Sequence, residues 1–197
     1  MKVAEKPAGS YPALLLDRDG VINVDKAYVH RIEDMDFIDG IFPLARAAVG
    51  AGMCLVVVTN QAGIGRGYYT EAQFQTLTEW MKKQFSEQGA PIAAVYHCPY
   101  HPEQGLGEYK LDSFDRKPNP GMILRARRDL DLDLAASVLI GDKRSDIEAA
   151  RRAEVGLTIL LKDREGAVEE SEAHLVVNTL HQARVALFGE PTELPKR

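Results

Sequence analysis

Cysteine, long apolar runs and excess positive charge are all scarce in this 197-residue sequence, and each shortage excludes a class of protein. The two cysteines, Cys54 and Cys98, are too few for a disulfide scaffold, and Cys54 opens an apolar run, so a reducing, intracellular setting is favoured. No apolar run approaches the roughly 20 residues that span a bilayer, and residues 1–12 carry charges without the apolar core of a signal peptide. We therefore expect a cytoplasmic protein with no membrane partner.

The charge balance is slightly acidic, with 24 Lys and Arg against 29 Asp and Glu and a formal net charge of −5. This balance favours solubility and gives no general attraction to nucleic acid, so we expect no nucleic-acid partner. Any anionic substrate must then be attracted by a local cluster of cations. Hydrophobic residues make up 45% of the chain, which is ordinary for a chain that buries a core.

Apolar runs that end abruptly in polar residues alternate with segments of helical periodicity. The expected strands are 13–16, 54–58, 92–96, 137–140, 157–161 and 175–177. The expected helices are 42–51, a helix capped by Thr70 that runs to about residue 88, 121–130, and a helix from about residue 145. Alternating strands and helices predict an α/β fold, with a doubly wound, mostly parallel sheet and helices on both faces.

The length of the chain fits one α/β domain. The sequence has no internal repeat, low-complexity stretch or obvious linker. We expect a single monomeric domain over residues 1–188 and a disordered tail over residues 189–197.

Polar residues follow three of the predicted strands, at the edge where ligands bind in open α/β sheets. They are Asp17 and Asp19 after the first strand, Thr59 and Asn60 after the second, and Asp142 after the strand at 137–140. Lys117 comes shortly before a predicted helix N-terminus, which is a natural anion site. Three carboxylates, two small hydrogen-bonding groups and one cation suit magnesium bound together with a phosphate.

Asp17 and Asp19 are two residues apart at a strand-to-loop transition, so both carboxylates can line one small cavity. One can attack phosphorus while the other gives and takes a proton, and Gly20 lets the chain turn away without a Cβ in the pocket. A polar turn is the alternative interpretation of these residues. Strand termination is the alternative for Thr59, and a solvated surface position is the alternative for Lys117. The combination of all these strand ends favours the catalytic interpretation.

Four segments together resemble the motifs of the haloacid dehalogenase-like phosphohydrolases, in that family's order, over about residues 13–161. They are 16–21 (LDRDGV), 58–60 (VTN), 116–118 (RKP) and 140–146 (IGDKRSD). The resemblance implies that Asp17 is the nucleophile and Asp19 the general acid and base. It also implies that Asp17, the Asp19 backbone carbonyl and Asp142 hold magnesium, while Thr59 and Lys117 grip the transferring phosphoryl group. Asp146 is assigned only a supporting position.

Three longer stretches resemble the branch of that family that removes the 7-phosphate from heptose 1,7-bisphosphate. They are 17–25 (DRDGVINVD), 59–68 (TNQAGIGRGY) and 116–122 (RKPNPGM). This resemblance implies a small phosphorylated sugar as the partner and a place in nucleotide-activated heptose and lipopolysaccharide core biosynthesis. It also implies substrate contacts from Asp25, Tyr28, Asn60, Gln61, Arg116 and Lys143. Independently, two extra cations beside a phosphate pocket that needs only Lys117 favour a substrate with a second anion.

The inserts between these segments are too short for a large cap domain, so we expect loops 23–36 and 97–115 to control access. Members of the branch often carry a structural zinc in the second loop, with a Cys-x-His and a Cys-x-Cys pattern. The corresponding residues here are 98–100 (CPY) and 113–115 (SFD), so only Cys98 remains. Because structural zinc usually takes four Cys or His ligands, we expect no zinc. The alternative is a substitute site of His97, Cys98 and His101 with Asp112 or Asp115.

Two other functions remain open at this point. The nearer one is a different small-molecule phosphatase of the same superfamily, such as one acting on histidinol phosphate. The more distant one is a phospho-receiver signalling domain, whose doubly wound fold also places acids, a Thr and a Lys at strand ends. The two-residue spacing of Asp17 and Asp19, and a length well beyond a minimal receiver, favour an enzyme.

Overall fold

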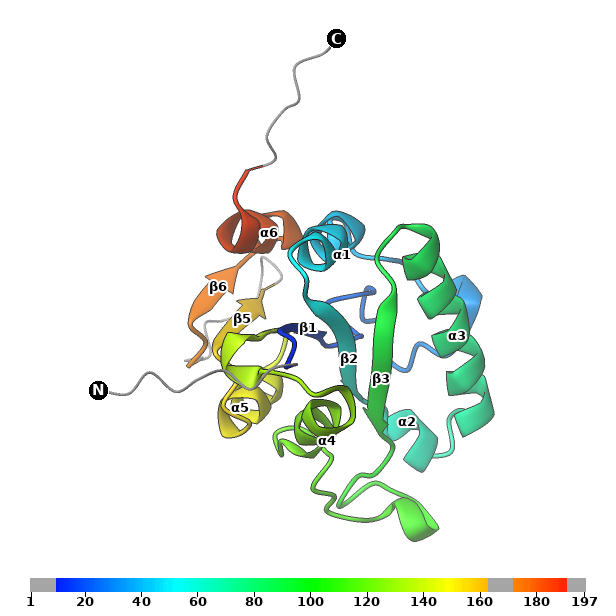
Figure 1. Ribbon diagram of the computed structural model, residues 1–197. Helices are drawn as coiled ribbons and strands as arrows, with labels where there is room; N and C mark the ends of the chain where they lie inside the picture. Colours follow the sequence, from blue (N-terminus) through cyan, green and yellow to red (C-terminus); the bar gives the residue numbers. More distant parts are fainter. Residues whose placement is uncertain (1–9, 163–171, 191–197) are drawn as a thin grey trace, which may run out of the picture.

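Six parallel strands form one sheet in the order β3-β2-β1-β4-β5-β6 (Figure 1). The computed structural model describes residues 10–162 and 172–190. The strands are β1 (Ala13–Leu16), β2 (Cys54–Asn60), β3 (Ile92–Cys98), β4 (Val138–Gly141), β5 (Leu157–Leu161) and β6 (Leu175–Val177). The helices are α1 (Ile41–Gly50), α2 (Ala62–Gly65), α3 (Glu71–Glu87), α4 (Gly121–Leu130), α5 (Arg144–Arg152) and α6 (Leu180–Phe188), with short 3-10 turns η1 (Ile32–Asp34), η2 (Gly107–Tyr109) and η3 (Leu134–Ala136).

Strand β1 lies at the centre of the sheet because all four of its residues are apolar and can be covered on both faces. It pairs in parallel with β2 on one side and with β4 on the other. Leu14 and Leu16 face one hydrophobic core and Leu15 faces the other, and all three are fully buried. The residue that follows β1 is therefore held in the middle of the sheet edge.

Helices cover both faces of the sheet, as the sequence predicts. One core packs α1, α3 and α6 against the sheet, through residues such as Leu44, Met81 and Leu180. The opposite core packs α4 and α5, through residues such as Ile123 and Ala150. The apolar stripes of these helices are thus divided between two layers, which is the doubly wound arrangement.

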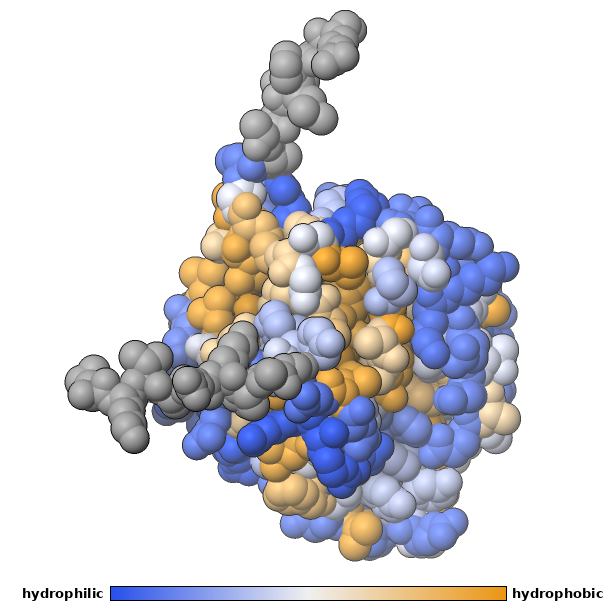
Figure 2. Space-filling model, in the orientation of Figure 1, coloured by the Kyte–Doolittle hydropathy of each residue, from blue (hydrophilic) through white to orange (hydrophobic). Residues whose placement is uncertain are grey.

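Helix α3 shows how local sequence sets an element and its exposed face. Thr70 and Gln73 form a reciprocal capping box at its N-terminus. Phe74, Leu77 and Phe85 turn inward and are buried. Its outer surface is covered by hydrophilic side chains, seen in blue over α3 in Figure 2.

Most predicted elements agree with the structure, and the differences lie at their ends. Strand β2 continues through Thr59 and Asn60, which pair with His97 and Cys98 of β3, so the polar residues end the strand rather than follow it. Two helices were not expected. One is α2, which has four residues and two glycines, and the other is α6, which is capped by Thr179.

The inserts of the described chain are small. Between β1 and β2 it contains only η1 and α1, and between β3 and α4 only η2, which agrees with the expected lack of a large cap. Within residues 10–162 and 172–190, none of the helices has the length and apolarity needed to cross a membrane. Residues 191–197 of the expected disordered tail lie outside the described residues.

Candidate active site

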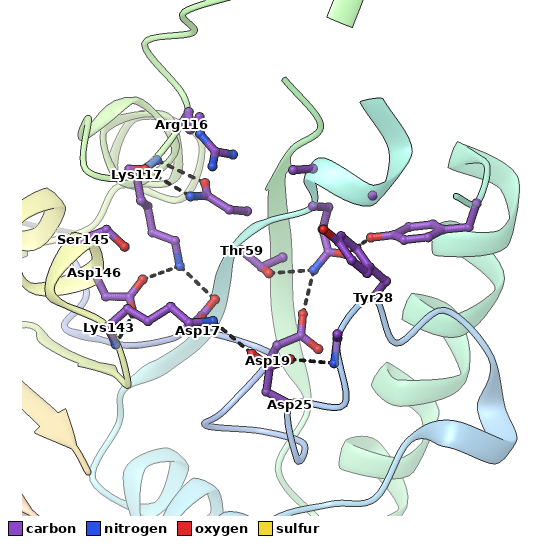
Figure 3. Close-up of a pocket in the computed structure, with 16 residues that line it drawn as sticks. Asp17, Asp19, Asp25, Tyr28, Thr59, Arg116, Lys117, Lys143, Ser145 and Asp146 are labelled. Carbon is purple, nitrogen blue, oxygen red and sulfur yellow. Dashed lines mark hydrogen bonds and ion pairs between the residues drawn. The ribbon is translucent and has the colours of Figure 1, made fainter. Parts of the chain in front are cut away.

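The polar residues at the carboxyl ends of β1, β2 and β4 meet at one cavity of about 430 Å³ (Figure 3). The sequence-predicted residues that line it are Asp17, Asp19, Asp25, Tyr28, Thr59, Asn60, Gln61, Arg116, Lys117 and Lys143. Ala27, Ala62, Gly63, Tyr69, Ser145 and Asp146 line it as well. The cavity therefore gathers residues separated by more than a hundred positions in the chain.

Lys117 forms a buried bridge between two carboxylates. Its Nζ lies 2.8 Å from Asp17 Oδ1 and 2.6 Å from Asp146 Oδ1, and it donates to the Val58 carbonyl at 2.9 Å. Lys117, Asp17 and Asp146 are only 4%, 5% and 1% exposed. Two of these contacts are hydrogen bonds, to Asp17 and Val58, and the third is an ion pair with Asp146.

Charge and burial oppose each other in this group. Burial raises the pKa of Asp17, and the nearby Lys117 offsets this only in part. Burial would lower the pKa of Lys117, but Asp146 and Asp17 outweigh it and raise the pKa above its usual range. Lys117 therefore stays cationic, and the centre of the cavity holds a fixed positive charge.

Asp142 joins Asp17 and Asp146 in the one acidic cluster, among the described residues, whose geometry suits a metal ion. One carboxylate oxygen from each of the three lies within 4.8 Å of the others. Asp142 Oδ1 is buried without a hydrogen-bond partner, as expected of an atom that a cation would occupy. Burial and the neighbouring Asp17 raise the pKa of Asp142 to about 8, so a divalent cation would relieve the repulsion.

The loop after β1 approaches Asp142 so closely that it needs a glycine. Gly20 has a φ of +92°, and a Cβ there would lie 2.2 Å from Asp142 Oδ2. Without a side chain, the Gly20 backbone can pass directly beside the Asp142 carboxylate, whereas the sequence suggested only that the chain turns away from the pocket here.

Asp19 lies in a cradle of hydrogen-bond donors. Arg18 reaches its carboxylate through Nε at 3.1 Å and Nη2 at 2.8 Å, and is itself only 1% exposed. Asn23 Nδ2 and Gln61 Nε2 each donate to Asp19 at 3.0 Å. Arg18 also donates to the Val29 carbonyl at 2.7 Å, which ties the following loop to the same cradle.

Gln61 connects the Asp19 cradle to Thr59. Its Nε2 donates to Thr59 Oγ1 at 2.8 Å as well as to Asp19, and its Oε1 accepts from the Tyr69 hydroxyl at 2.5 Å. Gln61 and Tyr69 are 2% and 4% exposed. Each polar atom of the Gln61 side chain is therefore engaged within the protein, although the residue lines the cavity.

Asn60 and Arg116 support the segment that carries Lys117. The Asn60 side chain donates to the Lys117 carbonyl at 3.0 Å and accepts from its backbone N–H at 3.1 Å. Arg116 donates to the Tyr100 carbonyl at 3.1 Å, and its partial burial lowers the pKa of the guanidinium. Arg116 also lines the cavity, where it adds a second cation beside Lys117.

The outer wall of the cavity comes from the loop after β1. Lys143 Nζ lies 3.0 Å from Asp25 Oδ2, and Arg66 donates to the Tyr28 hydroxyl at 2.6 Å. Ala27 and Tyr28 both have a φ of +58°, which is unusual for residues other than glycine and is often found at functional sites. The loop is thus held by polar contacts to Arg66, which follows α2, and to Lys143, which precedes α5.

The residues considered for a substitute zinc site point to different partners. His97 contacts Glu71 at 2.9 Å, whereas His101 accepts from the backbone N–H groups of Glu103 and Gln104. Cys98 is buried, and burial raises the pKa of its thiol. Across residues 10–162 and 172–190 these side chains form no cluster of three or more metal ligands.

Two residues of the site were not anticipated. Arg18 is fully buried although arginine usually lies at the surface, and Tyr69 reaches the site through Gln61. The sequence gives no signal for the burial of Arg18 or for the contact that Tyr69 makes. Asp146, for which the sequence suggests a supporting position, forms an ion pair with Lys117 from the first turn of α5.

Comparison with known proteins identifies similar sequences. Residues 114–183 match the family described as HAD-hydrolase-like. The chain is 58% identical over 165 residues to the D-glycero-alpha-D-manno-heptose-1,7-bisphosphate 7-phosphatase of Burkholderia mallei. The aligned region covers 84% of this chain and 87% of the relative. It is 46% identical over 175 residues to the D-glycero-beta-D-manno-heptose-1,7-bisphosphate 7-phosphatase of Escherichia coli K12, and this aligned region covers 88% of this chain and 92% of the relative.

Two solved structures share the fold. A protein from Mesorhizobium loti described as HAD-like superposes with a TM-score of 0.79 at 34% identity, over 94% of this chain and 90% of that one. A D,D-heptose 1,7-bisphosphate phosphatase from B. bronchiseptica, complexed with magnesium and phosphate, superposes with a TM-score of 0.74 at 26% identity. That match covers 89% of this chain and 97% of the other.

Proposed function

This chain belongs to the haloacid dehalogenase-like phosphohydrolases, and from that premise we propose that it removes the 7-phosphate of D-glycero-D-manno-heptose 1,7-bisphosphate. Asp17 stands at the carboxyl end of the central strand, with Lys117 against its carboxylate and Thr59 on the neighbouring strand. This placement carries the assignment as a phosphatase, because phosphoryl transfer depends on in-line positioning and concentrated positive charge.

The proposed reaction has two steps. In the first, Asp17 attacks phosphorus and forms an aspartyl phosphate, while Asp19 donates a proton to the oxygen that leaves with the sugar. In the second, Asp19 takes a proton from water, whose oxygen attacks the phosphorus, and inorganic phosphate departs from Asp17. Asp19 suits both steps because its carboxylate lies at the cavity wall among donors that fix its position.

Magnesium is the proposed cofactor. Asp17, Asp142 and the Asp19 backbone carbonyl would hold it, and the unpartnered Asp142 oxygen and the close approach at Gly20 support this set. When bound, magnesium supplies positive charge to the phosphoryl oxygens. Asp146 lies in the same cluster, but both its oxygens contact protein donors, so its main proposed role is to orient Lys117.

Lys117 and Thr59 would hold the transferring phosphoryl group. Lys117 is buried and permanently charged, so its charge acts in a medium that screens it little. Its ammonium group already contacts Asp17, Asp146 and the Val58 carbonyl, so a phosphoryl oxygen would be held beside these contacts or in place of one of them. Thr59 presents its hydroxyl at the end of β2, where Gln61 fixes it.

The substrate assignment is supported by the relatives and by the cations of the cavity. The relatives named as heptose-bisphosphate phosphatases match over more than four fifths of this chain. Arg116 and Lys143 add two positive charges beyond Lys117. Such charges suit a substrate whose second phosphate remains bound while the first is removed.

The sugar would be oriented by the cavity wall around these cations. We propose that Asp25, Tyr28, Asn60 and Gln61 contribute to this wall together with Arg116 and Lys143. The primary 7-phosphate can enter the cavity first and leave the ring near the loop after β1. The small phosphorylated sugar is the only partner that we propose.

The location, oligomeric state and domain content that we propose come from the sequence. We propose a monomeric enzyme in the cytoplasm, made of a single phosphatase domain over residues 1–188, with no nucleic-acid or membrane partner and no structural zinc. The product, heptose 1-phosphate, would then enter nucleotide-activated heptose and lipopolysaccharide core synthesis.

A comparison of substrates tests this function. We would measure kcat/KM for both anomers of heptose 1,7-bisphosphate, for fructose bisphosphate and for histidinol phosphate at one magnesium concentration. The expected result is a clear preference for the heptose bisphosphate. A preference for histidinol phosphate would leave the phosphatase chemistry intact and overturn the substrate assignment.

A further inference from the structure

We infer that Tyr69 and Gln61 are positioning residues that hold the acid/base carboxylate of Asp19 and the phosphate-binding hydroxyl of Thr59 in fixed relation. This inference rests on the proposed function, since it concerns the reaction assigned to Asp19. It also adds to the part assigned to Gln61. Besides lining the cavity wall, Gln61 acts on the reaction through its neighbours in the protein.

The four side chains form one continuous chain of hydrogen bonds. The Tyr69 hydroxyl donates to Gln61 Oε1 at 2.5 Å, and Gln61 Nε2 donates to Asp19 Oδ2 at 3.0 Å and to Thr59 Oγ1 at 2.8 Å. The amide has two N–H donors and one carbonyl oxygen, and each donor therefore has one acceptor. Both N–H donors of Gln61 are thus used within the protein, and its oxygen faces the Tyr69 hydroxyl.

Tyr69 determines which way the Gln61 amide points. Burial raises the pKa of the Tyr69 phenol, so it stays protonated and can donate. The atom facing it must then be the Gln61 oxygen, which leaves the NH2 group facing Asp19. A flipped amide would place two oxygens, Oε1 and the Asp19 carboxylate, against each other with no hydrogen between them. The Tyr69 hydroxyl therefore keeps the Gln61 NH2 group directed at the Asp19 carboxylate.

The position of the Tyr69 ring is itself fixed. The ring packs with Ile64 and Phe74 in a small separate core, and the His30 ring stacks on it with 5.0 Å between centroids and 2° between planes. A Cβ on Gly63 would lie 2.2 Å from the ring, so only glycine permits this approach. With the ring held on these sides, the hydroxyl cannot follow the amide if Gln61 moves.

Loss of the Tyr69–Gln61 contact should affect the two chemical steps differently for different substrates. An alkyl phosphate such as a sugar phosphate needs a proton on its leaving oxygen, whereas an aryl phosphate such as p-nitrophenyl phosphate has a much better leaving group. A misplaced Asp19 should therefore slow phosphoryl transfer from the sugar but not from the aryl substrate. It should slow hydrolysis of the aspartyl phosphate for both, because that step uses Asp19 as a base.

The test is Tyr69→Phe, with Tyr68→Phe as the matched control. Tyr68 is the adjacent tyrosine in the chain, is 57% exposed and lies outside the hydrogen-bond chain. For Tyr69→Phe we expect kcat/KM for the heptose bisphosphate to fall by about 10-fold, the effect of one lost buried hydrogen bond. With p-nitrophenyl phosphate we expect a rapid burst of nitrophenol and then slow turnover, while Tyr68→Phe behaves as wild type.

A double-mutant cycle checks that Tyr69 acts through Gln61. Gln61→Met keeps the length of the side chain and removes its donors, so it should reduce sugar-phosphate turnover by more than Tyr69→Phe. Adding Tyr69→Phe to Gln61→Met should then cause no further loss. Additive losses, equal losses in kcat/KM on the two substrates, or no loss in Tyr69→Phe would each overturn the inference.

An NMR measurement separates this inference from the proposed function. The Gln61 side-chain amide should give two distinct proton signals that exchange slowly with water in the wild type and rapidly in Tyr69→Phe. If the wild type hydrolysed neither phosphate, the proposed function would fail while these signals still tested the positioning pair. Identical Gln61 signals in both proteins would overturn the inference.

Discussion

Replacing Lys117 with methionine should destabilise the fold as well as stop catalysis. The change removes the ammonium group and keeps most of the apolar side chain, so packing is little disturbed. Asp17 and Asp146 then lose the cation that lies 2.8 Å and 2.6 Å from them, and the Val58 carbonyl loses a donor. Because both carboxylates are almost completely buried, water cannot replace the missing charge.

The expected cost is about 3–5 kcal/mol in the free energy of unfolding, the usual penalty for removing one partner of a buried ion pair. The cost should depend on pH. Without Lys117 the pKa of Asp17, which burial already raises in the folded state, rises further above its value in the unfolded chain. The folded mutant then holds protons that the unfolded chain releases as pH rises, so its deficit grows with pH.

Urea unfolding at pH 5.5 and pH 8 in the presence of a chelator measures this. Lys143→Met is the control, since Lys143 is 54% exposed and pairs with the partly exposed Asp25, a pair worth about 1 kcal/mol or less. Magnesium should restore part of the stability of Lys117→Met, because it would neutralise Asp17. If Lys117→Met cost no more than Lys143→Met at pH 8, the buried bridge would not have the energetic role given to it here.

Three further results are expected. Asp17→Asn should abolish phosphate release and Asp19→Asn should reduce it by about 10²-fold or more, with folding unchanged by circular dichroism; near-normal turnover in Asp17→Asn would exclude the covalent step. The Asp142 pKa of about 8 lies above its ordinary 3.8, so in this window the stability of the metal-free protein should fall as pH rises. Over the same window magnesium affinity measured by calorimetry should rise; a pH-independent affinity would contradict this. Arg116→Ala should reduce kcat/KM by about 10-fold or more for heptose bisphosphate but little for an aryl phosphate, since only the former has a second anion.

Residues whose role depends on a strand end could be placed from sequence. The apolar run of β1 stops at Asp17, and that of β4 stops just before Asp142, so the positions of the carboxylates follow from the sheet alone. The agreement extends to α4, predicted at residues 121–130, because two prolines and a glycine mark its start. Parallel strands place their carboxyl ends at one edge, which brought these residues together without any tertiary information.

Residues whose role depends on side-chain packing could not be placed in this way. Arg18 looked like an ordinary charged residue in a loop, and only the folded chain shows it buried between Asp19, the Val29 carbonyl and the Phe74 ring. Asn60 lines the cavity, but nothing in the sequence indicates that both ends of its amide bind the Lys117 backbone 57 residues away. Helix α2 was missed because four residues with two glycines show no periodicity.

The sequence separation across the Lys117 bridge has a consequence for folding. Lys117 and Asp17 are 100 positions apart, and Asn60 and Lys117 are 57 apart, so the site combines contacts of high contact order. Such contacts form late, because the chain entropy of closing long loops must be overcome first. Regain of catalytic activity should therefore lag behind regain of helicity during refolding. A nascent chain would remain without activity until β1, β2 and the segment preceding α4 had all docked.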